Sequence, residues 1–199
     1  MDPDLPARKE PARRSLLQHA CLGLLRLFGW RALAEPLPGP RGVIMVYPHT
    51  SNWDFVIGLL YRFGTGLRAN WIGKHTIFRW PFRGLMVRMG GVPISRRAPG
   101  GFIGAAIEQF KANDWMWLAL APEGTRQHTD HLKSGFYQIA LGAGVPCGLG
   151  FIDYATKTVG IQDFVRFSGN VEDDLAALRT YYADKRGRHR DGASEIRFG

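Results

Sequence analysis

Cysteine and long hydrophobic runs are both scarce in this sequence of 199 residues. Its two cysteines, Cys21 and Cys147, cannot form a framework of several disulfides, so we expect a reducing, cytoplasmic environment. A helix that crosses a bilayer needs about 20 consecutive apolar residues, and no stretch of this chain supplies them. The nearest one, residues 16–33, is interrupted by Gln18, His19, Arg26 and Arg31. We therefore expect no membrane-spanning helix.

Acidic residues are also few. The chain has 17 Asp and Glu against 26 Lys and Arg, which gives a formal net charge of +9. Such an excess favours an anionic partner: nucleic acid, an anionic membrane surface, or a phosphorylated or CoA-like substrate. No recognisable nucleic-acid-binding motif accompanies the charge, so we expect no nucleic-acid partner. Hydrophobic residues make up 45% of the chain and glycines number 25, a composition typical of a globular α/β protein.

The order of patterns along the chain predicts an α/β fold in a single domain, with a largely parallel central sheet flanked by helices. We assign residues 1–40 to a tail, an N-terminal amphipathic helix and a linker, residues 41–185 to the domain, and residues 186–199 to a basic C-terminal tail. Within the domain, β-like runs alternate with helical stretches, as in sheets of parallel strands joined by helices. Strands are expected near 43–47, 67–72, 92–94, 115–120 and 145–151, an edge hairpin from 157–161 and 164–167, and helices near 52–63, 76–89, 101–113, 134–143 and 172–184.

A histidine and an aspartate stand five positions apart directly after the apolar run 43–47. If a helix begins at Ser51 or Asn52, Asp54 falls in its first turn, and its carboxylate can reach back to the ring of His49. A histidine that removes a proton needs its far ring nitrogen held by such a partner. Without an evident Ser or Cys nucleophile, the pair suggests a base that activates the substrate's own hydroxyl or amine. The alternative is a helix-capping aspartate beside an unrelated loop histidine.

Polar residues follow four of the expected strands. His49 follows the first strand, Lys74 the second, Arg96 the third, and the loop 122–126 the fourth. In open α/β sheets, ligand sites gather beyond the carboxyl ends of the strands. We therefore expect these loops to form one basic cleft around His49 and Asp54. Lys74 could contact a phosphate of the substrate there, or it could be merely solvated.

Four motifs together resemble the glycerolipid acyltransferases that acylate lysophosphatidic acid. They are His49-x4-Asp54, the segment 91–96 (GVPISR), the segment 122–126 (PEGTR) and Val145-Pro146, and the resemblance covers about residues 40–155. It implies transfer of an acyl chain from acyl-CoA or acyl carrier protein to a lipid hydroxyl, with no metal, no cofactor and no acyl-enzyme. It also implies catalysis by His49, with Asp54 as its orienting partner. The acceptor site that it implies consists of Arg96, Glu123, Gly124, Thr125 and Arg126.

The acceptor itself stays open at this point. Arginine suits a phosphate or carboxylate, because its planar fork can bond to two oxygens, although Glu123 and Arg126 could also form only a salt-bridged turn. After Val145-Pro146 the family usually continues with aliphatic residues and another proline, whereas this chain has Cys147-Gly-Leu-Gly150, which could open one wall of the pocket. Lysophosphatidic acid is the first candidate and a lyso-ornithine or other amino-acid lysolipid the second. A hydrolase and a non-catalytic module that binds anionic lipid are the alternatives from other classes.

Two amphipathic stretches suggest contact with a membrane. Residues 16–33 could lie in the interface or pack on the domain, and residues 77–89, which interleave aromatics with arginines, could lie at headgroup level or form a core helix. With the positive charge, they predict a peripheral protein on the cytoplasmic face of the cell (inner) membrane, with an anionic surface as a partner. No metal site is expected, since His128 and His131 around Asp130 lack a full ligand set. The basic run 185–190 is expected to be solvated.

Overall fold

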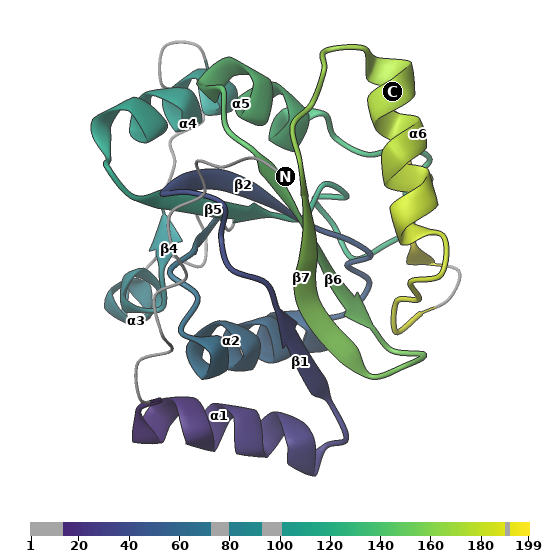
Figure 1. Cartoon of the computed structure of the whole chain (residues 1–199). Coiled ribbons are helices and arrows are strands. Elements are labelled where there is room, and N and C mark those ends of the chain that lie inside the picture. Colours follow the sequence, from purple (N-terminus) through teal and green to yellow (C-terminus); the bar gives the residue numbers. More distant parts are fainter. Residues whose placement is uncertain (1–13, 73–79, 93–100, 190–191) are drawn as a thin grey trace, which may run out of the picture.

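A seven-stranded sheet lies at the centre of the computed structural model, which describes residues 14–72, 80–92, 101–189 and 192–199 (Figure 1). The order of the strands is β1-β7-β6-β2-β5-β3-β4. Five neighbouring strands, β6, β2, β5, β3 and β4, are parallel, while β7 pairs antiparallel with β6 and parallel with β1. The strands are β1 (Arg31–Ala34), β2 (Arg41–Val46), β3 (Asn70–Ile72), β4 (Gly91–Val92), β5 (Met116–Leu120), β6 (Cys147–Asp153) and β7 (Thr158–Val165).

Helices cover both faces of this sheet. Figure 1 shows α1 and α2 on one side and α4, α5 and α6 on the other. The central strand β2 is buried on both faces, because Val43 and Met45 pack toward one helix layer and Ile44 packs toward the other. Such a doubly buried strand needs a continuous apolar run, as the sequence predicted. The helices are α1 (Leu16–Leu27), α2 (Trp53–Thr65), α3 (Arg83–Arg88), α4 (Gly101–Ala112), α5 (Gly135–Ala143) and α6 (Val171–Tyr182).

The predicted fold class is confirmed: one α/β domain has a largely parallel sheet flanked by helices and carries an amphipathic helix near its N-terminus. Helix α1 begins at a capping box, in which Ser15 and Gln18 each bond the other's main chain. It ends earlier than the stretch 16–33 suggested. Gly29 adopts φ +79°, and its N–H and that of Trp30 bond to carbonyl groups of the last turn. The chain then forms strand β1, which the sequence analysis had placed within the helix and linker.

The predicted edge hairpin is wrong. Residues 158–165 form one continuous strand, β7, which lies between β1 and β6 instead of at the edge. The reversal that the sequence analysis placed after residue 161 occurs before the strand, in a turn over residues 154–157. There, the Asp153 carboxylate accepts a hydrogen bond from the Ala155 N–H at 3.1 Å. The chain therefore reverses at Asp153, whose short side chain bonds to the main chain of the turn, and not at the polar Gln162 and Asp163.

The structure describes the amphipathic stretch 16–33 in full and the stretch 77–89 in part. Helix α1 buries Cys21, Leu22 and Leu25 and exposes a second apolar set: Leu16, Leu17, Leu24, Leu27 and Phe28. Of the stretch 77–89, residues 77–79 lie outside the described part of the chain. Helix α3, in the described part, has no buried residue and is therefore not a core helix. None of the helices in the described ranges is long and apolar enough to cross a membrane.

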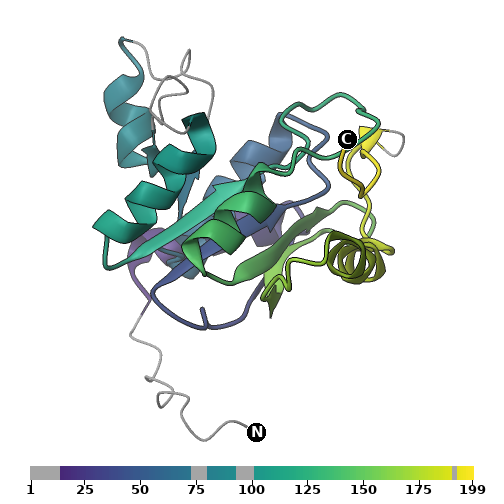
Figure 2. The ribbon, with the colours of Figure 1, turned by 90° about the horizontal axis from the view of Figure 1, so that it is seen from above.

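The segment that we predicted to be a basic, solvated tail folds back onto the domain in its described part. Phe198 pairs with Leu132, and its ring packs against Tyr137 at a centroid distance of 5.3 Å. Ile196 is buried, and its carbonyl group accepts a hydrogen bond from the Arg179 side chain. Figure 2 shows this yellow segment beside the loop that follows β5. The apolar Ile196 and Phe198 supply the burial that a charged tail alone would lack.

Candidate active site

The loop between β2 and α2 carries the predicted dyad. His49 Nδ1 lies 3.2 Å from Asp54 Oδ2, so the predicted contact between ring and carboxylate is confirmed. Asp54 is in the first turn of α2 and is only 2% exposed. Its Oδ2 also accepts a hydrogen bond from the Ser51 N–H at 2.9 Å, which fixes the carboxylate relative to the loop. Because Nδ1 faces Asp54, Nε2 is the ring nitrogen left to exchange a proton with a substrate.

A tyrosine that the sequence analysis missed completes this group. The Tyr154 hydroxyl donates to Asp54 Oδ1 at 2.7 Å, so both carboxylate oxygens are held. Tyr154 follows β6, and its ring packs edge-on against the ring of Trp30 with 4.9 Å between the two ring centroids. Burial, and then the bond to Asp54, raise the pKa of Tyr154, so its hydroxyl remains a donor at neutral pH. No sequence signal could have found it, since it lies 100 positions from Asp54.

The loop after β5 brings a buried carboxylate to the same place. Glu123 is 1% exposed, and its Oε2 accepts the His49 N–H at 2.6 Å while its Oε1 accepts the Ser194 N–H at 3.2 Å. Burial raises the pKa of Glu123 to about 7, although the two hydrogen bonds act in the opposite direction. The alternative of a Glu123–Arg126 salt bridge is not observed, because the carboxylate faces the main chain.

The remaining residues of this loop lie nearer the surface. Gly124 adopts φ +65°, and a Cβ there would fall 2.6 Å from Lys133 Nζ, so the loop needs glycine at this point. Arg126 is exposed and Thr125 is half-buried, with its Oγ1 accepting the Gln127 N–H. Lys74 and Arg96 lie outside the described residues. The structure therefore brings together the loops after β2 and β5, which carry His49, Asp54 and the 122–126 segment. Nearby, His128 and Asp130 are exposed, and no group of three potential metal ligands occurs among the residues that the structure describes.

An apolar cavity of about 180 Å³ extends from the dyad between α2 and the sheet. His49 and Asp54 are among its lining residues, and Gly58 lines it one helical turn beyond Asp54. Of the β6 glycines that the sequence analysis expected to open a wall, Gly150 lines the cavity and Gly148 does not. A Cβ at Gly148 or Gly150 would meet neighbouring atoms at 3.1 and 3.0 Å, so these glycines admit close packing. The other apolar lining residues include Ile44, Val46, Phe55, Leu59, Leu67, Trp71, Leu120, Phe151 and Ile161.

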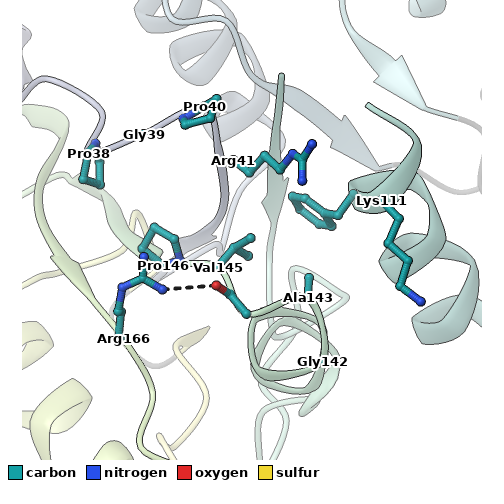
Figure 3. A pocket seen from close by; sticks show the side chains of 12 residues that line it. Pro38, Gly39, Pro40, Arg41, Lys111, Gly142, Ala143, Val145, Pro146 and Arg166 are labelled. Atoms are coloured by element: carbon teal, nitrogen blue, oxygen red, sulfur yellow. Dashed lines mark hydrogen bonds between the residues drawn. The ribbon is translucent and has the colours of Figure 1, made fainter. Parts of the chain in front are cut away.

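A second cavity, of about 340 Å³, lies at the opposite edge of the sheet, where β2 and β6 begin (Figure 3). Figure 3 shows Arg166 donating a hydrogen bond to the carbonyl group of Gly144, at 3.1 Å, beside the linker Pro38–Arg41. The described lining residues include Arg41, Lys111 and Arg166 but neither a histidine nor a carboxylate. This cavity therefore offers no group that could remove a proton at neutral pH, and the dyad's cavity is the candidate active site.

Comparisons with known proteins agree with this choice. The family model described as "Acyltransferase" matches residues 33–148, a span that contains the dyad and the 122–126 loop and ends before Tyr154 and Ser194. No curated protein matches the chain significantly. Among solved structures, the chain is similar to PlsC, the 1-acyl-sn-glycerophosphate (LPA) acyltransferase from Thermotoga maritima. That similarity has 18% sequence identity and a TM-score of 0.51, and it covers 84% of this chain and 74% of the other. At this identity it shows a shared fold.

Proposed function

The chain belongs to the Acyltransferase family, and from this premise we propose that it transfers a fatty acyl group from an acyl thioester to the hydroxyl of a lysolipid. One observation carries the proposal: a histidine held by a buried aspartate lines an apolar cavity. The pair supplies a base, and the cavity supplies an apolar environment beside it. Acyl transfer from a thioester with an alkyl tail needs both: a base for the acceptor hydroxyl and an apolar site for the tail.

The proposed reaction is a direct transfer. His49 Nε2 removes the proton from the acceptor hydroxyl, whose oxygen attacks the carbonyl carbon of the thioester. The carbon–sulfur bond then breaks, and the thiolate takes the proton from the imidazolium. Asp54 keeps the ring oriented and stabilises the imidazolium, as a buried carboxylate does for other catalytic histidines. Because a thioester is already activated, the mechanism needs no metal and no acyl-enzyme.

The apolar cavity is the proposed site of the donor's acyl chain. Because His49 lines the cavity, the carboxyl end of a bound chain would lie beside the base, and the walls are mostly apolar side chains from α2 and the central strands. Each methylene group removed from water contributes about 0.8 kcal/mol. A donor with a long chain should therefore bind more tightly than a short one, until the cavity is full.

The acceptor is proposed to be 1-acylglycerol-3-phosphate, with a lyso-ornithine lipid as the second candidate. Arg126 is exposed on the loop next to the dyad, where its guanidinium could bind a phosphate. Gly124 and Thr125 would line the same acceptor site, and Lys74 and Arg96 are proposed to bind the acceptor too. The family resemblance of the 122–126 segment supports the phosphate-bearing acceptor. The donor is proposed to be acyl-CoA or acyl-acyl carrier protein.

A peripheral position on the cytoplasmic face of the cell membrane fits these substrates. Trp53 and Val56, in the first turn of α2 beside Asp54, are exposed, as are the apolar residues on one side of α1. Exposed apolar side chains next to the dyad would bring it to the depth at which a lysolipid presents its hydroxyl. The net positive charge favours anionic lipids.

Lipid mass spectrometry tests the proposal. The purified protein would be incubated with acyl-CoA or acyl-acyl carrier protein and with a panel of lysolipids in mixed micelles. Formation of phosphatidic acid supports the first acceptor, and acylated lyso-ornithine lipid supports the second. Release of free fatty acid without a new lipid ester would indicate a hydrolase. No consumption of any thioester, with retained binding to anionic vesicles, would indicate a binding module.

A further inference from the structure

Residues 186–189 and 192–194 form a segment that packs against the loop carrying His49, while residues 190 and 191 lie outside the described part of the chain. The segment starts at the end of β6, where the Arg186 N–H donates to Asp153 Oδ1 at 3.1 Å and the Tyr154 N–H donates to the Arg186 carbonyl at 2.9 Å. The His189 N–H then donates to Thr50 Oγ1 at 3.2 Å. Thr50, which directly follows His49, is 2% exposed.

Two glycines of this segment fit closely against Thr50. A Cβ on Gly187 would lie 2.6 Å from Thr50 Oγ1, and one on Gly192 would lie 3.3 Å from Thr50 Cβ. Only a main chain without side chains can approach this closely. The segment is thus packed against the residue after the proposed base.

The same segment reaches the base by a second route, through Glu123. One carboxylate oxygen accepts the Ser194 N–H and the other accepts the N–H of His49 itself. Ser194 is itself fixed by further hydrogen bonds. Its carbonyl group accepts the Tyr47 hydroxyl at 2.7 Å, and its Oγ lies 2.7 Å from Thr129 Oγ1. Glu123 therefore connects the main chain of Ser194 to the main chain of His49.

We propose that Glu123 and the segment made of residues 186–189 and 192–194 are positioning elements of the acyl-transfer site, which hold the main chain of His49 and Thr50 so that the His49 ring meets the substrate correctly. The inference rests on the proposed function. It adds a part of the chain that lies beyond residues 33–148, the span of the family match. It also gives Glu123 a role through the main chain of His49, because the carboxylate is buried and both of its oxygens are already occupied.

Ser194→Pro tests the proposal, because proline lacks the N–H that Glu123 accepts. With the donor and acceptor that the wild-type protein uses, kcat should fall by ~10- to 10²-fold, the loss that follows from moving a catalytic group by about an ångström. Both KM values should stay near wild type, since the proposal gives the segment a contact with His49 and Thr50 and none with either substrate. Ser194→Ala keeps the N–H and should retain most of kcat. Glu195→Ala is the matched control, since that exposed side chain bonds only to Arg197 among the described residues.

Hydrogen exchange gives a readout that is independent of activity. The amide of His49 should be protected in the wild-type protein and should exchange faster in Ser194→Pro. If Ser194→Pro does not fold, Thr50→Val serves instead, because it keeps the size of the side chain and removes only the acceptor of the His189 N–H. Unchanged kcat and unchanged exchange in a folded variant would overturn the proposal, as would a rise in KM with kcat retained. A wild-type protein that acylates nothing would refute the proposed function, and the exchange result would still decide the positioning.

Discussion

Replacing Gly58 by leucine should shorten the acyl chain that the protein accepts. Gly58 lies in the interior of α2, lines the apolar cavity, and has no atom within 4 Å of the position that a Cβ would take. It follows Asp54 by four residues, which is about 6 Å along the helix axis. A leucine at this position should therefore fill the cavity one turn beyond the dyad without disturbing the helix.

The size of the effect follows from the methylenes that are displaced. Leucine adds four carbons, which take the place of about as many methylenes of a bound chain, each worth about 0.8 kcal/mol. The loss of about 3 kcal/mol corresponds to a ~10²-fold lower kcat/KM for palmitoyl-CoA. Butyryl-CoA should change little, because its chain ends near the level of the substitution. The free energy of unfolding should not fall, since glycine in a helix interior costs about 0.5–1 kcal/mol relative to alanine.

The assay is kcat/KM for butyryl-, octanoyl- and palmitoyl-CoA, with a thermal melt of each variant. Gly58→Ala should give a small shift in the same direction. Gly23→Leu is the matched control, because Gly23 also lies in a helix with open space around its Cβ position, but on α1 and away from the cavity. If Gly58→Leu folds as well as the wild-type protein and keeps the wild-type ratio of palmitoyl to butyryl activity, the cavity does not hold the acyl chain.

Three further predictions follow from the site and the surface. Tyr154→Phe removes only the hydroxyl that holds Asp54 Oδ1, so kcat should fall by ~10-fold in steady-state assays while the fold survives; an unchanged kcat would mean that Asp54 needs no second support. Since burial raises the pKa of Glu123 from 4.5 to about 7, its contribution to stability is present below pH 4.5 and is lost as the pH rises to about 7. Denaturant titrations across this range should show about 3 kcal/mol less loss for Glu123→Gln than for the wild-type protein, and parallel curves would contradict the shift. Replacing the exposed Leu17, Leu24 and Phe28 of α1 by serine should weaken binding to anionic vesicles in a flotation assay; equal binding would place the membrane contact elsewhere.

Local patterns predicted the parts of this molecule whose partners are close in sequence. The apolar run of β2 and the reach of Asp54 to His49 both involve residues within one element or one loop. Strand β1 was missed because four residues after a helix give too little periodicity to read. Its strand character comes from pairing with β7, more than 100 residues away in the chain.

The supports of the dyad could not be predicted for a similar reason. Tyr154 and Ser194 reach Asp54 and Glu123 only because β6 and the C-terminal segment fold beside the loops of β2 and β5. The basic composition of residues 185–190 indicated solvation, but the contacts of this segment with Asp153 and Thr50 are made by main-chain N–H groups and a glycine. Residue type alone carries no signal for contacts of that kind.

The central claim is that His49 is the base in an acyl transfer to a lysolipid hydroxyl. The most direct test compares the wild-type protein with His49→Ala for the rate at which 1-acylglycerol-3-phosphate and palmitoyl-CoA are converted to phosphatidic acid, measured by lipid mass spectrometry, with circular dichroism to confirm folding. We expect phosphatidic acid from the wild-type protein and a rate at least ~10²-fold lower from a folded His49→Ala variant. A folded His49→Ala variant that forms phosphatidic acid at the wild-type rate would contradict the mechanism.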